Sequence, residues 1–410
     1  MKDKYFCGLD VGTSKVCAVI AAFDPVDRQL NILGLGEAVC KGLRKGVVVN
    51  IDDTRQAVVE AIEKAEAIAE VKVKDVIINV NGYHIEGHLQ QGDTRIPRSD
   101  REITEEDVER VINSARAVPL SSDRQIIHSI PLDFRVDNQS GVVNPVGMEG
   151  NHLEVEVLLV TGDSSLINNL DKCIARAGFG IQSKIATILA PAEAVLAPEE
   201  KALGCAIIDI GEETVNLAIF IEGQIKYIGH NPIGSNYITT DLAYGLRTSF
   251  AEAKRIKEDY GQADKKSALD GEIEYLGVDG QTKYSANSEK IYKIIKPRVN
   301  EIVDFIVGEI VKSGYKQLIP GGIILSGGGS QLKGICRTIE ERAEGIQVRV
   351  GRPRDLKGES DLVSEPKYAT AVGMIEYLLR TNASYSFQDL AAVGRGGFFE
   401  KLKKWIDEMF

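Results

Sequence analysis

The chain has 410 residues, 43% of them apolar and 27% charged, and its 49 basic and 60 acidic side chains leave a net charge of −11. At about 150 residues per domain, this length predicts two or three domains with a substantial core. The acidic balance excludes a general nucleic-acid binder, because phosphate neutralisation needs a basic face. No apolar run of about eighteen residues and no apolar leader is present, so we expect neither a membrane-spanning helix nor a secretory signal.

The six cysteines and five histidines are scattered along the chain without metal-ligand spacing. Most of the cysteines lie among Val, Ile and Ala, as reduced core cysteines do in a cytoplasmic protein. No Ser-His-Asp or Cys-His arrangement for nucleophilic catalysis is supported. The composition therefore predicts a cytoplasmic, multi-domain α/β protein.

Two segments half a chain apart repeat one pattern. Residues 5–22 and 204–221 each read as a buried strand, a turn of the form Asp-x-Gly, and a second strand. Each is followed by a third strand and then a helix, which we expect at residues 30–39 and 53–69 in the first half and at 224–230 and 237–246 in the second. Two such units indicate two related domains that face each other.

The remaining elements are placed around this repeat. A buried strand is expected at residues 73–82, an inserted α+β subdomain at 84–163, and an exposed loop at 262–290. The domain boundaries that follow are 1–83 for the first part of domain 1, 84–163 for the inserted subdomain, 164–203 with 365–380 for the rest of domain 1 and its connecting helices, 204–364 for domain 2 with an outer subdomain at about 236–300, 381–397 for a flexible linker, and 398–410 for an amphipathic helix.

The first repeated turn has the parts that a polyphosphate needs. Gly12 lets the backbone approach an anion closely, and Thr13 and Ser14 add hydroxyl and amide donors. Lys15 adds positive charge, and Asp10 at the strand end can hold Mg²⁺ through water. A single glycine turn between strands is more often only a turn, so this motif needs support from elsewhere in the chain.

Two further loops give that support. The turn of the second repeat offers Asp209, Gly211 and Thr214, with Asp209 as a second metal candidate. A strand at 324–326 then runs into Gly327, Gly328 and Gly329 and a helix, which suits close backbone contact with a nucleotide. Three such loops, two of them related by duplication, predict a nucleotide cleft between the domains.

The end of the chain has the pattern of an interfacial membrane helix. Its apolar side chains recur at three- and four-residue steps, flanked by lysines and including the single tryptophan of the chain. A helix this short is marginal in water, so its folding is expected to be coupled to insertion. The alternative is docking on the protein's own core or in a partner's groove. The residues expected to bind the membrane are Phe398, Phe399, Lys401, Leu402, Lys403, Lys404, Trp405, Ile406, Met409 and Phe410.

The order of the three loops resembles the actin-like ATPase superfamily, which includes actin, MreB, sugar kinases and heat-shock chaperones. Residues 8–16 (Gly-Leu-Asp-Val-Gly-Thr-Ser-Lys-Val), the sequence Asn-Pro-Ile-Gly at 231–234, and Thr-Thr-Asp-Leu-Ala at 239–243 narrow the resemblance. With the inserted subdomain and the amphipathic end, they resemble the FtsA family of bacterial cell-division proteins over essentially the whole chain.

This resemblance implies an actin-like two-domain α/β fold built from duplicated β-β-β-α-β-α units, with ATP or ADP and Mg²⁺ in the cleft. It adds Gly234, Ser235 and Lys257 to the nucleotide contacts. It also implies a polymerising membrane adaptor at the cytoplasmic face of the cell membrane at the division site, which tethers polymers of the tubulin-like FtsZ and recruits other division proteins. The C-terminal peptide of FtsZ is expected on the outer subdomain, at Arg298; an ordinary solvated arginine is the alternative.

Four positions depart from the superfamily pattern. Glu212 and Glu213 replace glycines of the second phosphate loop and would repel a polyphosphate unless they turn to solvent or Mg²⁺. Ala190 stands where MreB-like proteins carry a glutamate that positions the attacking water, and Lys254 stands where they carry an acidic residue. We therefore expect a slow ATPase at most. Glu193 is either a substitute for the missing glutamate or a solvated helix residue.

Small residues in two segments, 190–194 and 369–373, predict two helices that cross closely. The resemblance makes them the connectors between the domains, and hence a hinge. Two other functions fit parts of the sequence. A small-molecule kinase or ATPase would share the cleft, but the sequence offers neither a substrate-side base nor a reason for an amphipathic end in such an enzyme. An actin-like adaptor of pilus assembly would share the fold, and the amphipathic end counts against it.

Overall fold

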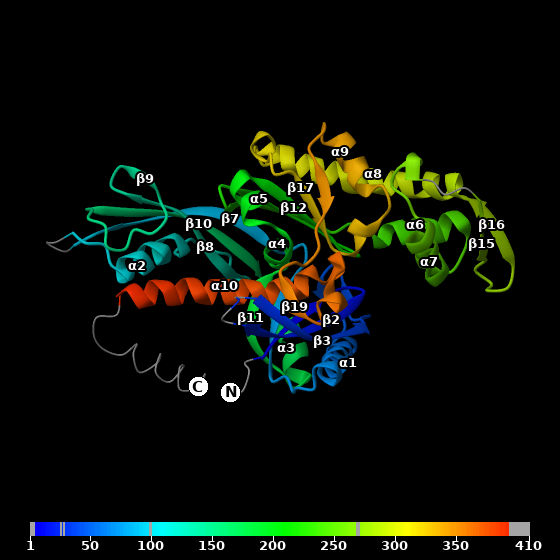
Figure 1. Cartoon of the computed structure of the whole chain (residues 1–410), viewed down its shortest axis with the longest axis horizontal. Helices are drawn as coiled ribbons and strands as arrows, with labels where there is room; N and C mark the ends of the chain where they lie inside the picture. Colours follow the sequence, from blue (N-terminus) through cyan, green and yellow to red (C-terminus); the bar gives the residue numbers. More distant parts are fainter. Residues whose placement is uncertain (1–4, 25–26, 28, 98–100, 268–270, 393–410) are drawn as a thin grey trace.

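A computed structural model describes residues 5–24, 27, 29–97, 101–267 and 271–392. The expected membrane helix at residues 398–410 lies outside the described residues. Two sheets form the centres of two lobes, with the inserted subdomain at one end of the molecule and the outer subdomain at the other (Figure 1).

Domain 1 is built on a six-stranded sheet of order β11-β6-β1-β2-β3-β19, in which β1, β2 and β3 are antiparallel neighbours and β6 runs parallel to β1. Helices α1 and α3 cover one face of the sheet, and α4 and α10 cover the other. The bounds are β1 (Tyr5–Val11), β2 (Lys15–Asp24), β3 (Gln29–Val39), β4 (Leu43–Arg44), β5 (Val47–Val48), α1 (Ile51–Ala69), β6 (Asp75–Val80), α3 (Ser164–Arg176), β11 (Gly180–Ala186), α4 (Leu189–Val195), β19 (Leu356–Gly358) and α10 (Ala369–Ala392).

Domain 2 repeats this arrangement. Its five-stranded sheet has the order β14-β13-β12-β17-β18, with β12, β13 and β14 antiparallel and β17 parallel to β12. The bounds are α5 (Pro198–Leu203), β12 (Cys205–Ile210), β13 (Val215–Ile221), β14 (Gln224–Asn231), α6 (Asn236–Leu246), α7 (Phe250–Tyr260), β15 (Glu272–Leu276), β16 (Lys283–Asn287), α8 (Ser288–Lys312), β17 (Ile323–Ser326), α9 (Ile335–Arg342) and β18 (Val348–Val350).

The two sheets place equivalent strands in the same order, so the internal duplication read from the sequence is confirmed. The expected helix at 53–69 is α1, which begins two residues earlier, at Ile51. Its N-cap is Asn50, whose side chain accepts hydrogen bonds from the amides of Asp52 and Asp53. The two aspartates therefore occupy the first turn, where their negative charges interact favourably with the helix dipole.

The inserted subdomain is a four-stranded antiparallel sheet of order β7-β10-β8-β9 with one helix packed on it. Its bounds are β7 (Glu86–Arg95), α2 (Glu105–Arg116), β8 (Arg124–Val136), β9 (Gln139–Val142) and β10 (His152–Asp163). It contacts both lobes. His128 accepts a hydrogen bond of 3.0 Å from the amide of Ala186 in domain 1, and Lys226 of domain 2 lies 3.7 Å from Glu156.

Two expectations about connecting segments are corrected. The stretch 262–290, expected to be an exposed loop, holds the hairpin of β15 and β16, because alternate residues such as Ile273 and Tyr275 are buried against the outer subdomain. The linker expected from residue 381 is helical as far as Ala392. The sequence between these positions contains no glycine or proline that would end the helix, and the first glycine is Gly394.

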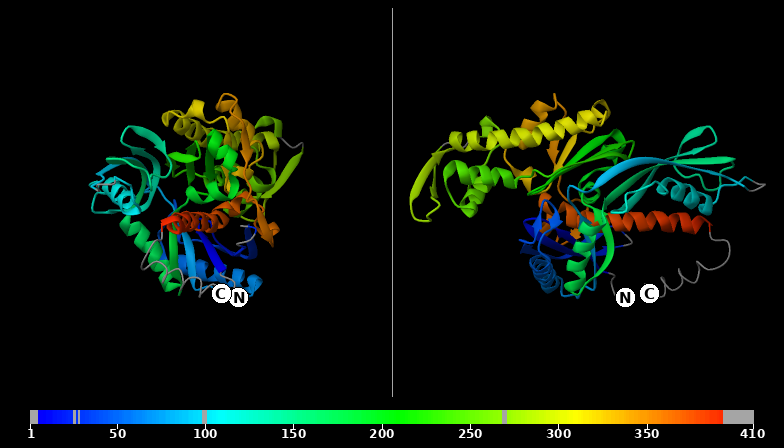
Figure 2. Two further views of the ribbon diagram at one scale, coloured as in Figure 1. Left: turned by 60° about the vertical axis from the view of Figure 1, so that its left-hand side comes forward. Right: turned by 180° about the vertical axis from the view of Figure 1, so that it is seen from behind.

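The connecting helices α4 and α10 cross between the lobes, and α10 then runs on beneath the inserted subdomain (Figures 1 and 2). A methyl carbon added at Gly373 would lie 1.9 Å from the carbonyl oxygen of Ala190, so the two backbones touch. This confirms the close crossing expected from the small residues. Among the helices in the described part of the chain, none is long and apolar enough to cross a membrane.

Candidate functional site

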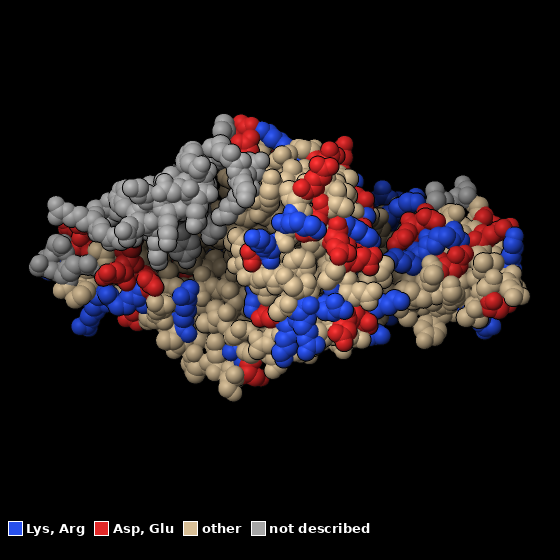
Figure 3. Space-filling model, turned by 90° about the horizontal axis from the view of Figure 1, so that it is seen from below, with Lys and Arg blue, Asp and Glu red and all other residues tan. Residues whose placement is uncertain are grey.

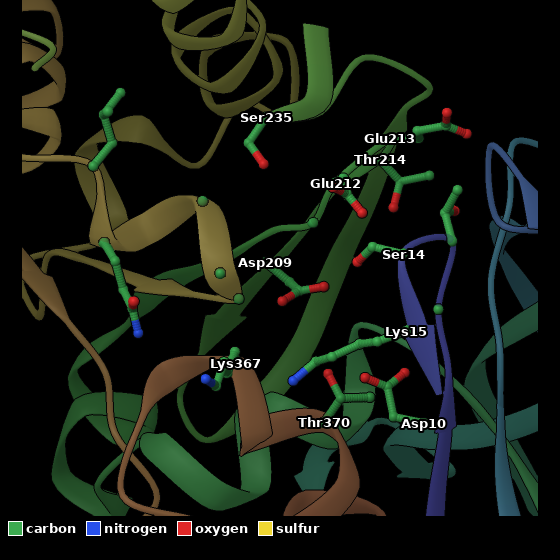
Figure 4. Close-up of a pocket in the computed structure, with 18 of the residues that line it drawn as sticks. Asp10, Ser14, Lys15, Asp209, Glu212, Glu213, Thr214, Ser235, Lys367 and Thr370 are labelled. Carbon is green, nitrogen blue, oxygen red and sulfur yellow. The ribbon is translucent and has the colours of Figure 1, made fainter. Parts of the chain in front are cut away.

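A cleft of about 540 Å³ lies between the two domains, within the range of small-molecule sites. The turns of β1–β2, β12–β13 and the glycine loop after β17 converge on it (Figure 4). Of the predicted nucleotide contacts, all except Gly234 line the cleft, namely Asp10, Gly12, Thr13, Ser14, Lys15, Asp209, Gly211, Thr214, Ser235, Lys257, Gly327, Gly328 and Gly329. Gly234 lies just behind the lining, where a Cβ would be 2.6 Å from the carbonyl of Glu212.

The first two loops have the same backbone geometry. In the first, the amide of Gly12 donates to the carbonyl of Lys15 over 3.0 Å, and in the second, the amide of Gly211 donates to the carbonyl of Thr214 over 2.8 Å. Asp10 and Lys15 lie on either side of the first turn, Asp209 and Thr214 lie on either side of the second, and all four line the cleft. Duplication has therefore produced two matching anion-facing turns, one from each domain.

Asn79, at the end of β6, fixes the strand end of the first loop. Its side-chain oxygen accepts from the amide of Val11 at 2.8 Å, and its Nδ2 donates to Asp10 at 2.7 Å. Lys15 forms an ion pair with Glu37 and lies 4.5 Å above the ring of Tyr368. Both contacts hold the lysine side chain at the floor of the cleft (Figure 4).

Asp10 and Asp209 approach the same region from opposite domains. Burial, together with the charge of Asp209, raises the pKa of Asp10 to about 7. Burial raises the pKa of Asp209 to about 6, although a hydrogen bond from Asn216 acts in the other direction. A cation between two such carboxyl groups would favour their ionised form and so lower both pKa values again. Carboxylate oxygens are also the hard ligands that Mg²⁺ prefers. The pair therefore fits the proposed metal, although the described residues hold no cluster of three or more His, Cys, Asp or Glu side chains placed to bind a metal.

Each of the two glutamates of the second loop has a partner within the protein. Glu213 accepts a hydrogen bond of 2.6 Å from the backbone amide of Lys45 in domain 1. Glu212 lies 3.9 Å from Lys254. The two departures therefore compensate each other, because they place opposite charges side by side. Burial raises the pKa of Glu212, and the charges of Lys254 and Lys257 act in the other direction.

The other end of the cleft lies against the outer subdomain. Lys257 donates to the carbonyl of Ser235 at 3.4 Å, and burial lowers the pKa of its amine. Ile238 and Leu332 add apolar surface beside these polar groups. A charged and polar end next to a partly apolar end suits a nucleotide, whose phosphates and nucleoside differ in the same way.

Sequence reasoning missed several lining residues, including Asn81, Thr187, Lys367 and Thr370. Asn81 donates to the hydroxyl of Thr214 over 3.2 Å, a contact between the two domains. Its position near the end of the expected strand at 73–82 was the available signal, because a polar residue at a strand end adjoins the cleft in this fold class.

Two positions discussed for hydrolysis lie away from the cleft lining. Ala190 is fully buried in the crossing of α4 with α10, so no carboxylate takes its place there. Glu193 pairs with Lys201 at 3.0 Å and with Arg380 at 3.1 Å. It is neither a solvated residue nor a substitute that faces the cleft.

Arg298, expected to bind a partner, lies on α8 of the outer subdomain. Its Nε donates to Asp241 at 2.9 Å, it forms an ion pair with Glu301, and it stacks 5.2 Å above the ring of Tyr237. It is therefore not an ordinary solvated arginine. A partner carboxylate would have to share the guanidinium with Asp241.

Comparison with known proteins agrees with the fold. Among solved structures, the chain is similar to that of a PilM–PilN type IV pilus biogenesis complex (TM-score 0.66, 17% identity, 90% of this chain and 97% of that one). It is also similar to MreB5 of Spiroplasma citri bound to AMPPNP (TM-score 0.54, 14% identity, 94% and 100%). A chain of the MamK double helical filament follows (TM-score 0.52, 12% identity, 91% and 98%). These likenesses confirm the actin-like fold.

Sequence comparison is more specific. The family described as "Cell division protein FtsA" matches residues 206–373, and "SHS2 domain inserted in FTSA" matches residues 82–161. The cell division protein FtsA of Neisseria meningitidis serogroup B is 37% identical over 100% of this chain and 99% of its own length. That of Escherichia coli K12 is 30% identical over 99% and 98%. The chain therefore belongs to the FtsA family of cell division proteins.

Proposed function

We propose that this protein is a nucleotide-binding, polymerising adaptor that tethers FtsZ polymers to the cytoplasmic face of the bacterial membrane at the division site and recruits other division proteins. The observation that carries the proposal is the cleft, in which two duplicated turns and a third glycine loop face one another. Its ligand is ATP or ADP with Mg²⁺. The solved MreB5 with AMPPNP has the same fold and supports this choice.

Each part of the cleft has a role in this proposal. The backbone amides of the two turns and Lys15 hold the phosphates, and Asp10 and Asp209 hold Mg²⁺, which would neutralise the phosphate charge. Ser235 and Lys257 bind at the nucleoside end. Because Ala190 offers no carboxylate for an attacking water, hydrolysis is slow, and the nucleotide acts mainly to hold the domains together.

Membrane attachment is assigned to residues 398–410. On the face of the molecule in Figure 3, lysine and arginine side chains are interspersed with acidic ones over the described residues, so that part of the surface offers no single basic field for anionic lipid. One short helix holds a membrane reversibly, whereas a filament of subunits presents many at high effective concentration. The filament-forming MamK, with its similar fold, supports self-association.

Vesicle flotation tests this part. The full chain is expected to float with anionic vesicles and a chain ending at Leu390 is expected not to, while a polymerisation-deficient full chain binds more weakly than the wild type. Equal binding by all three would rule out a membrane helix reinforced by polymerisation.

The FtsZ C-terminal peptide is placed beside Arg298, where α6 and α8 meet. Arg298→Ala is expected to weaken binding of that peptide at least about tenfold, because a partly buried charge-assisted contact is lost. Arg255→Ala is the matched control, since Arg255 also forms ion pairs within the outer subdomain, with Glu252 at 2.8 Å. Equal losses in both variants, or none in either, would contradict the placement.

The alternative is a small-molecule kinase or ATPase on the same scaffold, which shares the cleft. Steady-state hydrolysis separates the two functions. Many turnovers per second would favour the enzyme, and turnover over minutes favours the adaptor.

A further inference from the structure

The hairpin turn between β4 and β5 touches both phosphate loops. The two strands pair Leu43 with Val48 and Arg44 with Val47, which leaves a two-residue turn. Both turn residues, Lys45 and Gly46, have positive φ (+49° and +79°), the pattern of a type I′ hairpin.

The two amides at the tip of this turn point to different domains. The Gly46 amide donates to the Thr13 hydroxyl of the first loop over 3.4 Å, within domain 1. The Lys45 amide donates to the Glu213 carboxylate of the second loop over 2.6 Å, across the cleft. The hairpin therefore links the two loops that face the phosphate end.

Glu213 makes a bond that the usual glycine of such a loop could not make. Hydrogen bonds to a carboxylate are stronger than those between neutral groups. The neighbouring contact of Asn81 with Thr214 is between neutral side chains and is longer, at 3.2 Å. Figure 4 shows the Glu213 carboxylate directed away from Asp209. Glu213 nevertheless lines the cleft, so its carboxylate places a negative charge at the rim of the phosphate end. It also occupies the backbone amide of Lys45, which could otherwise donate to an anion.

We propose that Glu213 makes the cleft discriminate between nucleoside diphosphates and nucleoside triphosphates. This inference rests on the proposed nucleotide function. A third phosphate brings additional negative charge to the two loops, and the carboxylate of Glu213 repels that charge. The same carboxylate withholds the Lys45 amide, so a triphosphate is held less well than the loops alone would hold it. A diphosphate, with less charge, is affected less.

The test uses the full-length protein and Glu213→Gln, which keeps an acceptor for the Lys45 amide and removes the charge. Glu222→Gln, on the exposed turn between β13 and β14, is the matched control. With Mg²⁺ present, Glu213→Gln is expected to bind AMPPNP about tenfold more tightly than the wild type and ADP less than about twofold more tightly. Glu222→Gln is expected to change neither affinity.

A second measurement tests the hairpin contact without any nucleotide. Hydrogen–deuterium exchange of the peptide 41–48 is expected to be faster in Glu213→Ala than in the wild type, because the Lys45 amide loses its acceptor. In Glu213→Gln it is expected to stay close to the wild type. Equal exchange in Glu213→Ala and the wild type would overturn the contact.

The outcomes separate this inference from the function on which it rests. If the wild type binds both nucleotides and Glu213→Gln changes the two affinities equally, or not at all, the discrimination is refuted and the nucleotide function stands. If the wild type and every variant bind neither nucleotide, the proposed nucleotide function fails, and the discrimination fails with it.

Discussion

Replacing Gly373 by alanine tests the crossing of the two connecting helices. The new methyl carbon would lie 1.9 Å from the carbonyl oxygen of Ala190 and 2.6 Å from its carbon, well inside the ordinary contact range that begins at 3.4 Å. Because the obstructing atoms belong to a backbone, they cannot rotate away, and α4 and α10 must separate by more than 1 Å, on the order of one bond length.

The expected magnitude follows from two opposing terms. Overpacking of a core typically costs about 1–3 kcal/mol, and a clash with backbone belongs at the upper end of that range. Alanine gains up to about 1 kcal/mol over glycine in a helix. Gly373→Ala should therefore lower the free energy of unfolding by about 2 kcal/mol.

Gly308→Ala is the matched control. Gly308 is exposed on α8, and an added methyl carbon meets nothing within 4 Å. Only the helix propensity acts there, so this variant should be more stable by about 0.5–1 kcal/mol. Urea denaturation followed by circular dichroism measures both. If the two variants shift the midpoint in the same direction, the reasoning about backbone contact at the crossing is refuted.

Three further predictions concern charge. Burial lowers the pKa of His128 from 6.5 to about 4. The neutral imidazole therefore contributes fully to stability above pH 6.5, and up to about 3 kcal/mol of that contribution is lost as the pH falls towards 4. The denaturation midpoints at pH 7 and pH 5 should differ less in His128→Gln than in the wild type. Burial and the charge of Glu193 raise the pKa of Glu376 from 4.5 to about 8, so the protein loses stability as the pH rises through that range. At pH 8, Glu376→Gln should be more stable than the wild type by on the order of 3 kcal/mol. Equal stability of the two proteins would count against the reasoning. Lys254→Ala should weaken nucleotide binding about threefold, because Glu212 loses its ion-pair partner, and adding Glu212→Gln should restore the affinity. Strictly additive effects in this double-mutant cycle would show that the pair is not coupled.

The fold could be predicted well because its main signals are local. The Asp-x-Gly turns between buried strands recur in both halves, and both halves form the same sheet order. The glycine loops that converge on the cleft were readable for the same reason. Each is a short strand–turn unit, whose chemistry depends on neighbouring residues.

Contacts between distant parts of the chain could not be predicted. The bond of Glu213 to Lys45 joins residues 168 positions apart, and nothing near either residue indicates the other. The sequence did show that Glu212 and Lys254 departed from the family pattern, but only the packing of α7 beside the second loop revealed that they compensate each other. The expected linker began too early, because residues 381–392 are polar and rich in serine but contain no glycine or proline that would end α10.

The central claim is that the two duplicated turns hold a nucleotide together with Mg²⁺. Equilibrium titration of a fluorescent ATP analogue, with and without Mg²⁺, tests it in the wild type and in Asp10→Asn, which keeps an acceptor for Asn79 and removes the charge. The account predicts saturable binding of one nucleotide per chain. The affinity should fall at least about tenfold when Mg²⁺ is absent, and also in Asp10→Asn that is shown to be folded. Absence of saturable binding, or equal affinity in all conditions, would contradict it.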